Sequence, residues 1–154
     1  MNTLSRIAMR IASGDGQFLM LVIGIPGSGK STFAKSVPNA VHYEADMYFE
    51  DGEGGYHFDM KRIGEAHRWC QRMVDNELSK GNNVVVSNTG LSRWERDVYY
   101  NIAEKYGVQI KLKVMTGDYG NIHGVPEHTI EMMKKRFEPV SQYEIQKHDI
   151  EVVS

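Results

Sequence analysis

The sequence has 154 residues, of which 41% are hydrophobic and 25% charged, and these proportions exclude disordered and fibrous chains. Its single cysteine excludes an internal disulfide framework, and the sequence has no Cys/His cluster for a zinc site. The longest apolar run, residues 18–23, is far shorter than the ~20 residues of a membrane helix, and the N-terminus lacks the apolar segment of a secretory signal. We therefore expect a soluble, cytoplasmic protein with a single domain over residues 1–154.

The net charge of −2 argues against a protein that coats duplex DNA nonspecifically, because such binding depends on neutralising many phosphates. Charge is also unevenly distributed. Residues 42–60 contain six acidic side chains and no lysine or arginine. Brief contact with the end of a nucleic acid remains compatible with this composition.

The first half of the chain predicts β–α units around a mainly parallel sheet. Residues 18–23 form a continuous apolar run typical of a strand that is buried on both faces. Helix-forming residues follow from 31 to about 37. Alternating apolar residues over 41–45 predict a second strand that ends at Asp46, and the glycine-rich stretch 49–59 predicts a loop.

The second half continues the alternation of helices and strands. A helical period over 60–80 precedes a buried strand at 84–86, and alternating apolar residues predict another strand over 108–114. The segment Ser92–Glu95 has the S-x-x-E pattern of a capping box, which predicts a helix that ends at Gly107. A further helix is expected from Pro126 to about residue 137. The tail from Pro139 is ambiguous, and its residues 150–153 could add an edge strand. The expected strand order is 2-3-1-4.

Residues 24–32, Gly-Ile-Pro-Gly-Ser-Gly-Lys-Ser-Thr, match the phosphate-loop pattern G-x-x-x-x-G-K-[ST]. The match directly follows a predicted strand and opens a predicted helix, which is the context that phosphate binding requires. The fold class is therefore an α/β three-layer P-loop NTPase, kinase-like, with ATP and Mg²⁺ as cofactors. We expect Lys30 to reach the β- and γ-phosphates and Ser31 to bind the metal. The predicted nucleotide contacts are Gly24, Pro26, Gly27, Ser28, Gly29, Lys30, Ser31 and Thr32.

The reaction class follows from what surrounds this loop. The sequence has no N-K-x-D guanine motif, and the strand at 84–86 leads to Asn88 rather than to the acidic pair of motor and ring ATPases. A small kinase fits best. Such an enzyme needs a carboxylate that accepts the proton of the acceptor hydroxyl, and Asp46, just past the second strand, is our candidate. A turn-capping or helix-capping role for Asp46 is the alternative.

Four later segments carry a resemblance to a known family. They read A-D-x-Y-F at 45–49, A-H-x-W at 66–69, S-N-T at 87–89 and H-G-V-P at 123–126. Together with the phosphate loop they resemble the kinase domain of phage-type polynucleotide 5′-kinases and a group of small AAA-type P-loop kinases. The resemblance covers roughly residues 18–138. It implies ATP- and Mg²⁺-dependent phosphorylation of a 5′-hydroxyl of DNA or RNA, with Asp46 matching the general base.

The sequence departs from that family at the acceptor side. The family's polynucleotide kinases have an arginine three residues after the base, where this chain has Phe49, and an acidic residue where it has Asn88. The arginines of the family's lid are also absent before Val125-Pro126. Two alternatives therefore stay open. One is a kinase for a nucleoside, a modified-base hydroxyl or another small molecule, and the other is a catalytically weak nucleotide-binding regulatory module.

Several side chains could replace the missing contacts. His123 could contact phosphate from a lid over about 116–136, and Arg93, Arg96 or Arg136 could supply charge in the transition state. We assign Lys30, Asp46 and Arg96 as the catalytic set. His67 is expected to be a packed histidine rather than a ligand contact. Five aromatic residues near the acceptor loop either stack on a base or close the core: Tyr48, Phe49, Tyr56, Phe58 and Trp69.

Overall fold

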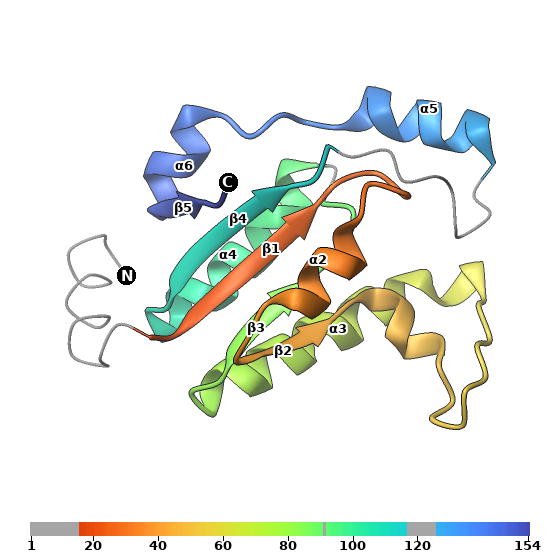
Figure 1. Cartoon of the computed structure of the whole chain (residues 1–154), viewed down its shortest axis with the longest axis horizontal. Helices are drawn as coiled ribbons and strands as arrows, with labels where there is room; N and C mark the ends of the chain where they lie inside the picture. The colour runs from red at the N-terminus through yellow and green to blue at the C-terminus, as the bar shows by residue number, and fades with distance from the viewer. Residues whose placement is uncertain (1–15, 91, 117–125) are drawn as a thin grey trace.

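Parallel strands form one five-stranded sheet in the order β2-β3-β1-β4-β5 in the computed structural model, which describes residues 16–90, 92–116 and 126–154 (Figure 1). Every neighbouring pair is parallel. This order confirms the predicted arrangement and the added edge strand. The strands are β1 Phe18–Ile23, β2 Ala40–Tyr43, β3 Asn83–Val86, β4 Gln109–Val114 and β5 Ile150–Val152.

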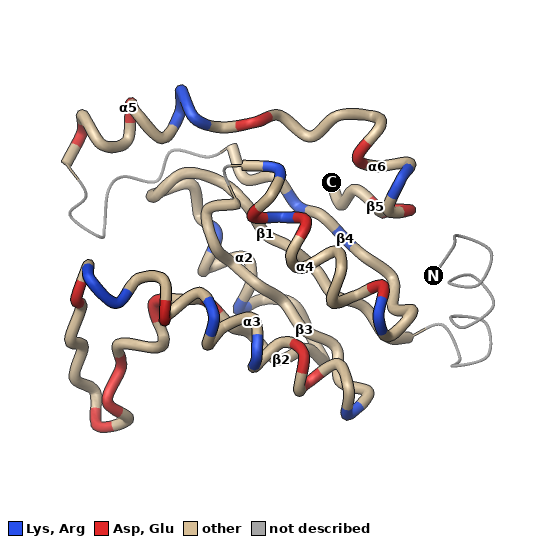
Figure 2. Tube along the Cα trace, turned by 180° about the vertical axis from the view of Figure 1, so that it is seen from behind, with Lys and Arg blue, Asp and Glu red and all other residues tan. Residues whose placement is uncertain are grey.

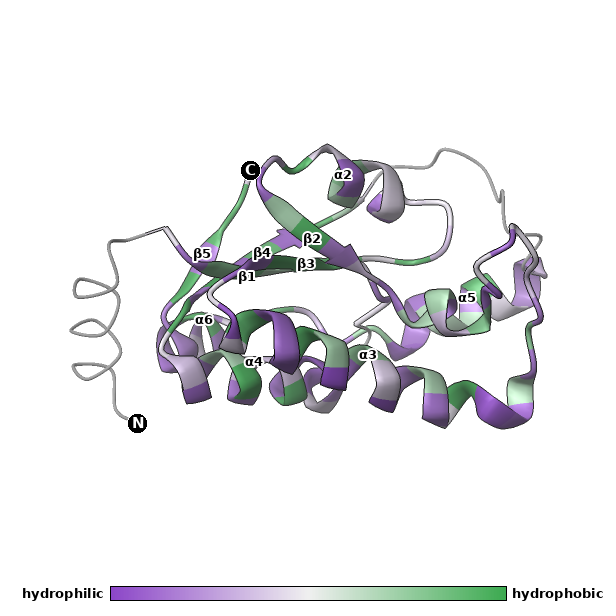
Figure 3. Cartoon of the chain, turned by 90° about the horizontal axis from the view of Figure 1, so that it is seen from below, coloured by the Kyte–Doolittle hydropathy of each residue, from purple (hydrophilic) through white to green (hydrophobic). Residues whose placement is uncertain are grey.

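Helices cover both faces of this sheet, which gives the three layers expected of the fold (Figure 3). Helix α2 lies on one face, and α3, α4 and α6 lie on the other. No helix of the described residues is long and apolar enough to cross a membrane. The helices are α2 Lys30–Ser36, α3 Ile63–Ser79, α4 Arg93–Tyr106, α5 Glu127–Arg136 and α6 Gln142–His148, with short 3₁₀ helices η1 Ala45–Phe49 and η2 Met60–Arg62.

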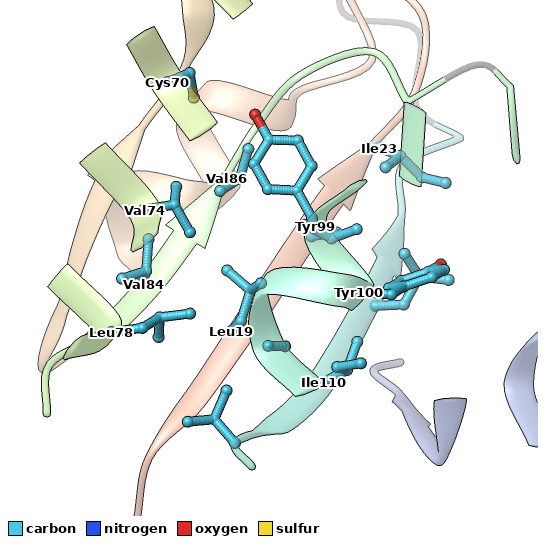
Figure 4. Close-up of a cluster of buried hydrophobic side chains, with 14 of the residues drawn as sticks. Leu19, Ile23, Cys70, Val74, Leu78, Val84, Val86, Tyr99, Tyr100 and Ile110 are labelled. Atoms are coloured by element: carbon cyan, nitrogen blue, oxygen red, sulfur yellow. The ribbon is translucent and has the colours of Figure 1, made fainter. Parts of the chain in front are cut away.

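The central strand β1 is buried on both faces, as its continuous apolar run predicts. Leu19 belongs to the larger cluster between the sheet and α3 and α4, and Met20 belongs to the smaller cluster under α2. Figure 4 shows the larger cluster, in which Val74 of α3 and Tyr99 of α4 converge on β3 and β1. Because β1 leads directly into the phosphate loop, this burial fixes where the loop begins.

The prediction that the second strand runs to Ala45 and ends at Asp46 is wrong. The last ladder bond of β2 is donated by the Ser87 amide to the Tyr43 carbonyl at 3.1 Å. The next available amide, that of Ala45, donates instead to Asn88 Oδ1 at 2.9 Å. The side chain of Asn88 therefore ends the strand, and the chain turns into η1 with Asp46 in its first turn.

The start of α4 confirms the predicted capping box. The Glu95 amide donates to Ser92 Oγ at 3.4 Å, and the Ser92 amide donates to Glu95 Oε2 at 3.0 Å. The prediction for the tail from Pro139 is ambiguous, although Ser141 and Glu144 have the same spacing as Ser92 and Glu95. In the structure Ser141 caps α6, which supplies the connection that a parallel strand such as β5 requires.

A buried ion pair ties α6 to α4. Arg96 donates to both carboxylate oxygens of Glu144, at 2.8 and 3.0 Å, and both side chains are 1% exposed. Tyr100 donates to the same carboxylate. Burial by itself raises the pKa of Glu144, but the bonds from Arg96 and Tyr100 outweigh it and leave the pKa below its ordinary value. The pair therefore holds the C-terminal segment against the core.

We predict that Glu144→Gln lowers the free energy of unfolding by about 3–5 kcal/mol at neutral pH, because it leaves the buried Arg96 charge unpaired. A carboxylate whose pKa is lowered on folding contributes stability above its unfolded pKa of 4.5 and loses that contribution as the pH falls through the lower folded value. The measurement is urea unfolding at several pH values. The difference in free energy of unfolding between Glu144→Gln and the natural chain should become smaller below about pH 4.5.

Glu151→Gln is the matched control, since Glu151 forms an exposed pair with Lys111 at 3.5 Å. Its effect should stay within about 1 kcal/mol. An equal loss in both variants would contradict the role assigned to the buried pair.

Candidate active site

The phosphate loop follows β1 and has the backbone conformations that only glycine adopts easily. Gly27 and Gly29 have φ values of +83° and +95°, and Gly29 is the N-cap of α2. A Cβ on Gly24 would lie 2.6 Å from Ser28 Oγ and 2.9 Å from the carbonyl oxygen of Met115. The Gly24 amide donates to the carbonyl of Thr89 at 3.1 Å. The loop is therefore packed directly against the segment that follows β3.

Two polar side chains of the loop fit a phosphate ligand. Lys30 Nζ donates to the carbonyl of Ile25 at 3.0 Å, so the ammonium group folds back over the loop. Burial lowers the pKa of Lys30, although Glu44 and Asp46 oppose this shift. Ser28 Oγ is buried and has no hydrogen-bond partner among the described residues. A hydroxyl in this state suits an acceptor-rich group such as a phosphate.

Glu44, which follows β2, is bonded to α2 and to the segment that follows β3. Its Oε2 atom accepts a hydrogen bond from Ser31 Oγ at 2.8 Å and another from Ser87 Oγ at 2.9 Å. His42 Nε2 lies 2.6 Å from the same Ser87 hydroxyl. Burial lowers the pKa of His42 despite the nearby carboxylate, which favours the neutral imidazole. Carboxylate and hydroxyl oxygens are ligands that Mg²⁺ prefers, so Ser31 and Glu44 fit that ion together with phosphate and water oxygens.

In the sequence, Glu44 is only one of the six acidic residues of the stretch 42–60, and no prediction singles it out. The signal that would have singled it out is its place, directly after β2 and two residues before Asp46. At the carboxyl edge of a parallel sheet, residues that end neighbouring strands lie close together. That edge brings Glu44 beside Ser31 and Ser87, which are 13 and 43 residues away in sequence.

Asp46 is exposed in η1 at the same edge of the sheet. Its Oδ1 atom accepts a hydrogen bond from the Tyr56 hydroxyl at 3.2 Å, and burial together with Asp46 raises the pKa of Tyr56. The backbone just before Asp46 is held by Asn88, whose amide nitrogen also donates to Tyr99 at 3.2 Å. The residue that replaces an acid of the resembled family thus positions the element that carries the candidate base.

The structure does not bring Arg96 to the phosphate loop. Its guanidinium donates to Glu144, and Nη1 donates to the carbonyl of Gly90 at 2.8 Å. We therefore correct the prediction that Arg96 supplies charge to the transferred phosphate, because its donors are committed to buried partners. Arg93 pairs with Asp97 at 2.8 Å. Arg136 ends α5 and is exposed, whereas His123 and the first half of the expected lid, residues 117–125, lie outside the described residues.

The five aromatic residues divide between the two expected roles. Phe49 is 5% exposed and belongs to the core, and Tyr48 and Trp69 pack against it. Tyr56 and Phe58 are about half exposed, and their rings stack with centroids 6.4 Å apart. Phe49, Tyr48 and Trp69 therefore close the core. Tyr56 and Phe58 form an aromatic surface next to Asp46.

A cavity of about 340 Å³ lies between α3 and α4, and we refer to it as the α3–α4 pocket. Its floor is apolar, and its rim includes His67 and Arg68 from α3 and Trp94 from α4. Asn88 and Thr89 line the end that faces the phosphate loop. The pocket therefore opens at the same sheet edge as Asp46. His67 was expected to be a packed histidine. It is half-buried, and part of its side chain lines the pocket.

A family model described as an AAA domain, AAA_33, matches residues 19–119. Human NEDD4-binding protein 2 is 31% identical over 149 residues, and the match covers 88% of this chain and 8% of that protein. A putative bifunctional polynucleotide kinase/RNA ligase of Autographa californica nuclear polyhedrosis virus is 25% identical over 127 residues, 72% of this chain and 18% of that protein. The chain thus spans less than a fifth of either relative.

Among solved structures, a chain of the Pnkp1/Rnl/Hen1 complex matches with a TM-score of 0.54 and 22% identity. The match covers 81% of this chain and 40% of that chain. At this identity the likeness concerns the fold. It agrees with the parallel sheet and its α/β layers.

We predict that Lys30→Ala weakens nucleotide binding, probed with ATP, roughly 10–100-fold, because the expected charge-assisted contact to the phosphates is removed. Isothermal titration calorimetry measures this affinity directly. Lys35→Ala is the control, since Lys35 lies in the last turn of α2, away from the loop. Equal affinities for the two variants would exclude Lys30 as a phosphate ligand.

Proposed function

Since the chain belongs to the AAA domain family of P-loop proteins, we propose that it is an ATP- and Mg²⁺-dependent kinase that phosphorylates a hydroxyl group. One observation carries this proposal. Asp46 lies exposed in η1 at the carboxyl edge of the sheet, close enough to Lys30 to oppose the lowering of the pKa of Lys30. The residue before it, Ala45, is bonded to Asn88, which lines the α3–α4 pocket. A carboxylate near both the phosphate loop and a candidate acceptor pocket is suited to take the acceptor's proton.

The transfer can be written with this chain's own groups. Backbone amides of the loop and Lys30 hold the triphosphate, with Lys30 exchanging the Ile25 carbonyl for phosphate oxygens. The acceptor oxygen bonds to the γ-phosphorus while the bond from that phosphorus to the β–γ bridging oxygen breaks. Asp46 receives the hydroxyl proton, and ADP leaves. Mg²⁺ would be held by Ser31 and Glu44 and would neutralise phosphate charge.

The acceptor that we favour is the 5′-hydroxyl of DNA or RNA. The similarity to a viral protein named as a polynucleotide kinase supports this class, as do the exposed Trp94 on the pocket and the Tyr56–Phe58 stack, because bases stack on aromatic rings. A free nucleoside or other small molecule is the alternative. It is favoured by the size and apolar floor of the pocket and by Phe49 in place of an arginine.

We predict that Asp46→Asn lowers kcat by roughly 10²–10⁴-fold while ATP affinity changes far less, since the change removes the proton acceptor and leaves the hydrogen bonds of the phosphate loop in place. The assay is transfer of labelled γ-phosphate to 5′-hydroxyl oligonucleotides, to the same oligonucleotides with a 5′-phosphate, and to free nucleosides. Asp51→Asn is the control in the same acidic region. Transfer by Asp46→Asn at the natural rate would remove Asp46 from the mechanism, and ATP binding without transfer to any acceptor would favour a regulatory module.

We also predict that Glu44→Gln reduces the gain in ATP affinity that Mg²⁺ produces, by about 10–100-fold. The readout is ATP affinity measured with and without Mg²⁺, which does not depend on turnover. A glutamine can still accept from Ser31 and Ser87, so the fold should be retained. Glu50→Gln, exposed at the end of η1, is the control. An unchanged effect of Mg²⁺ in Glu44→Gln would show that this carboxylate does not serve the metal.

A further inference from the structure

The α3–α4 pocket continues into an open groove between the same two helices. This groove has a volume of about 630 Å³, and we refer to it as the α3–α4 groove. Arg68, Gln71 and Val98 line both the pocket and the groove, so the two form one continuous path. The path starts at the sheet edge beside Asn88 and runs along α3 as far as Ser79.

Arg68 and Arg72 bring positive charge to this path. Both are exposed, and neither makes a hydrogen bond or an ion pair with any residue of the described ranges. Like charges four residues apart destabilise a helix in isolation. Two unpaired arginines that line one groove are therefore suited to an anionic ligand that carries more than one charge.

The acidic residues nearby form their hydrogen bonds with other partners, although Arg68 is close enough to Glu65 to help lower the pKa of that carboxylate. Asp75, in the groove, accepts from Lys105 at 3.0 Å and from the Tyr106 hydroxyl. Glu65, at the start of α3, accepts from Arg62 at 3.0 Å and from Tyr48 at 2.9 Å. The acid-rich loop between η1 and η2 lies beyond the N-terminal end of α3, as Figure 2 shows, so it does not line the groove.

The repeat of charge along α3 matches a polymeric anion. Arg68 and Arg72 are one helical turn apart, about 6 Å along the axis, which is comparable to the distance between successive phosphates of an extended strand. Trp94, 69% exposed, offers a ring at the pocket end of the same path. An aromatic ring followed by a row of cations is the pattern that proteins use to bind single strands.

We propose that the α3–α4 groove binds the single-stranded polynucleotide chain that follows the acceptor 5′ end, with Arg68 and Arg72 each contacting a backbone phosphate. The inference rests on the proposed kinase function, whose acceptor it specifies. The 5′-terminal base lies in the pocket against Trp94, and the phosphates on its 3′ side pass Arg68 and then Arg72. These two side chains supply, from α3, the phosphate contacts that Phe49 cannot make.

Binding is tested without turnover, by fluorescence anisotropy of oligothymidylates of increasing length that carry a 5′-hydroxyl and a 3′ fluorophore. Each of Arg68→Gln and Arg72→Gln should weaken binding roughly tenfold. Each should also reduce the slope of log affinity against log salt by about 0.7. Affinity should rise as the first phosphates are added and then level off, since the groove holds a short segment.

The matched control is Lys35→Gln, which removes one positive charge from the exposed last turn of α2, on the opposite face of the sheet. It should bind as the natural chain does. Arg68→Lys/Arg72→Lys, which keeps the charge, should retain most of the salt slope. Thermal unfolding of every variant establishes that the fold is intact, as expected for exposed positions.

An equal loss of affinity in the Gln control, or no loss in Arg68→Gln and Arg72→Gln, would overturn the groove proposal. So would an affinity that is the same for a nucleoside and for longer chains. If the protein phosphorylates nucleosides and Arg68→Gln binds oligothymidylates as tightly as the natural chain does, the kinase proposal is supported and the groove proposal is wrong. Arginine-dependent binding without any transfer would support the groove and count against the kinase.

Discussion

The burial of β1 on both faces is the constraint on which the rest of the structure depends. This strand pairs with β3 on one side and β4 on the other, and its side chains enter both hydrophobic clusters. Its side chains are packed closely on both faces, so a shift of its register would disrupt the packing of both clusters. Its carboxyl end then delivers Gly24 to one place, against Thr89 and Met115. The packing of β1 in the core therefore determines the position of the phosphate loop.

Polar side chains then complete the edge that the core establishes. Asn88 stops β2 and starts η1, Glu44 links Ser31 with Ser87, and Arg96 holds the Gly90 carbonyl. The bonds of Asn88 and Glu44 join segments that follow different strands, and the bond of Arg96 ties α4 to the segment just before it. The edge is thus supported from the sheet and from α4 and α6, because Arg96 is itself held by Glu144. A site for phosphate transfer needs such support, since small displacements of reacting groups are costly in rate.

The sequence predicted the regular elements and the phosphate loop well because their signals are local. The apolar run at 18–23, the capping box at Ser92 and the glycines of the loop each specify their own conformation. The prediction was wrong where a distant side chain decided the outcome. The strand that was expected to include Ala45 ends earlier because Asn88, 43 residues away, takes its amide. Arg96 is drawn into the core by Glu144, 48 residues away.

What the sequence by itself determined is the fold class, the positions of the regular elements and the phosphate-loop motif, since hydrophobic period and glycine placement act over a few residues. Only the tertiary structure decided which charges remain available. Among the residues that the structure describes, Arg96 is neutralised in the core, Asp75 and Glu65 are bound to neighbours, and Arg68 and Arg72 face a groove without partners. Pairing of charges depends on which helices meet, and that is a property of packing over long sequence separations.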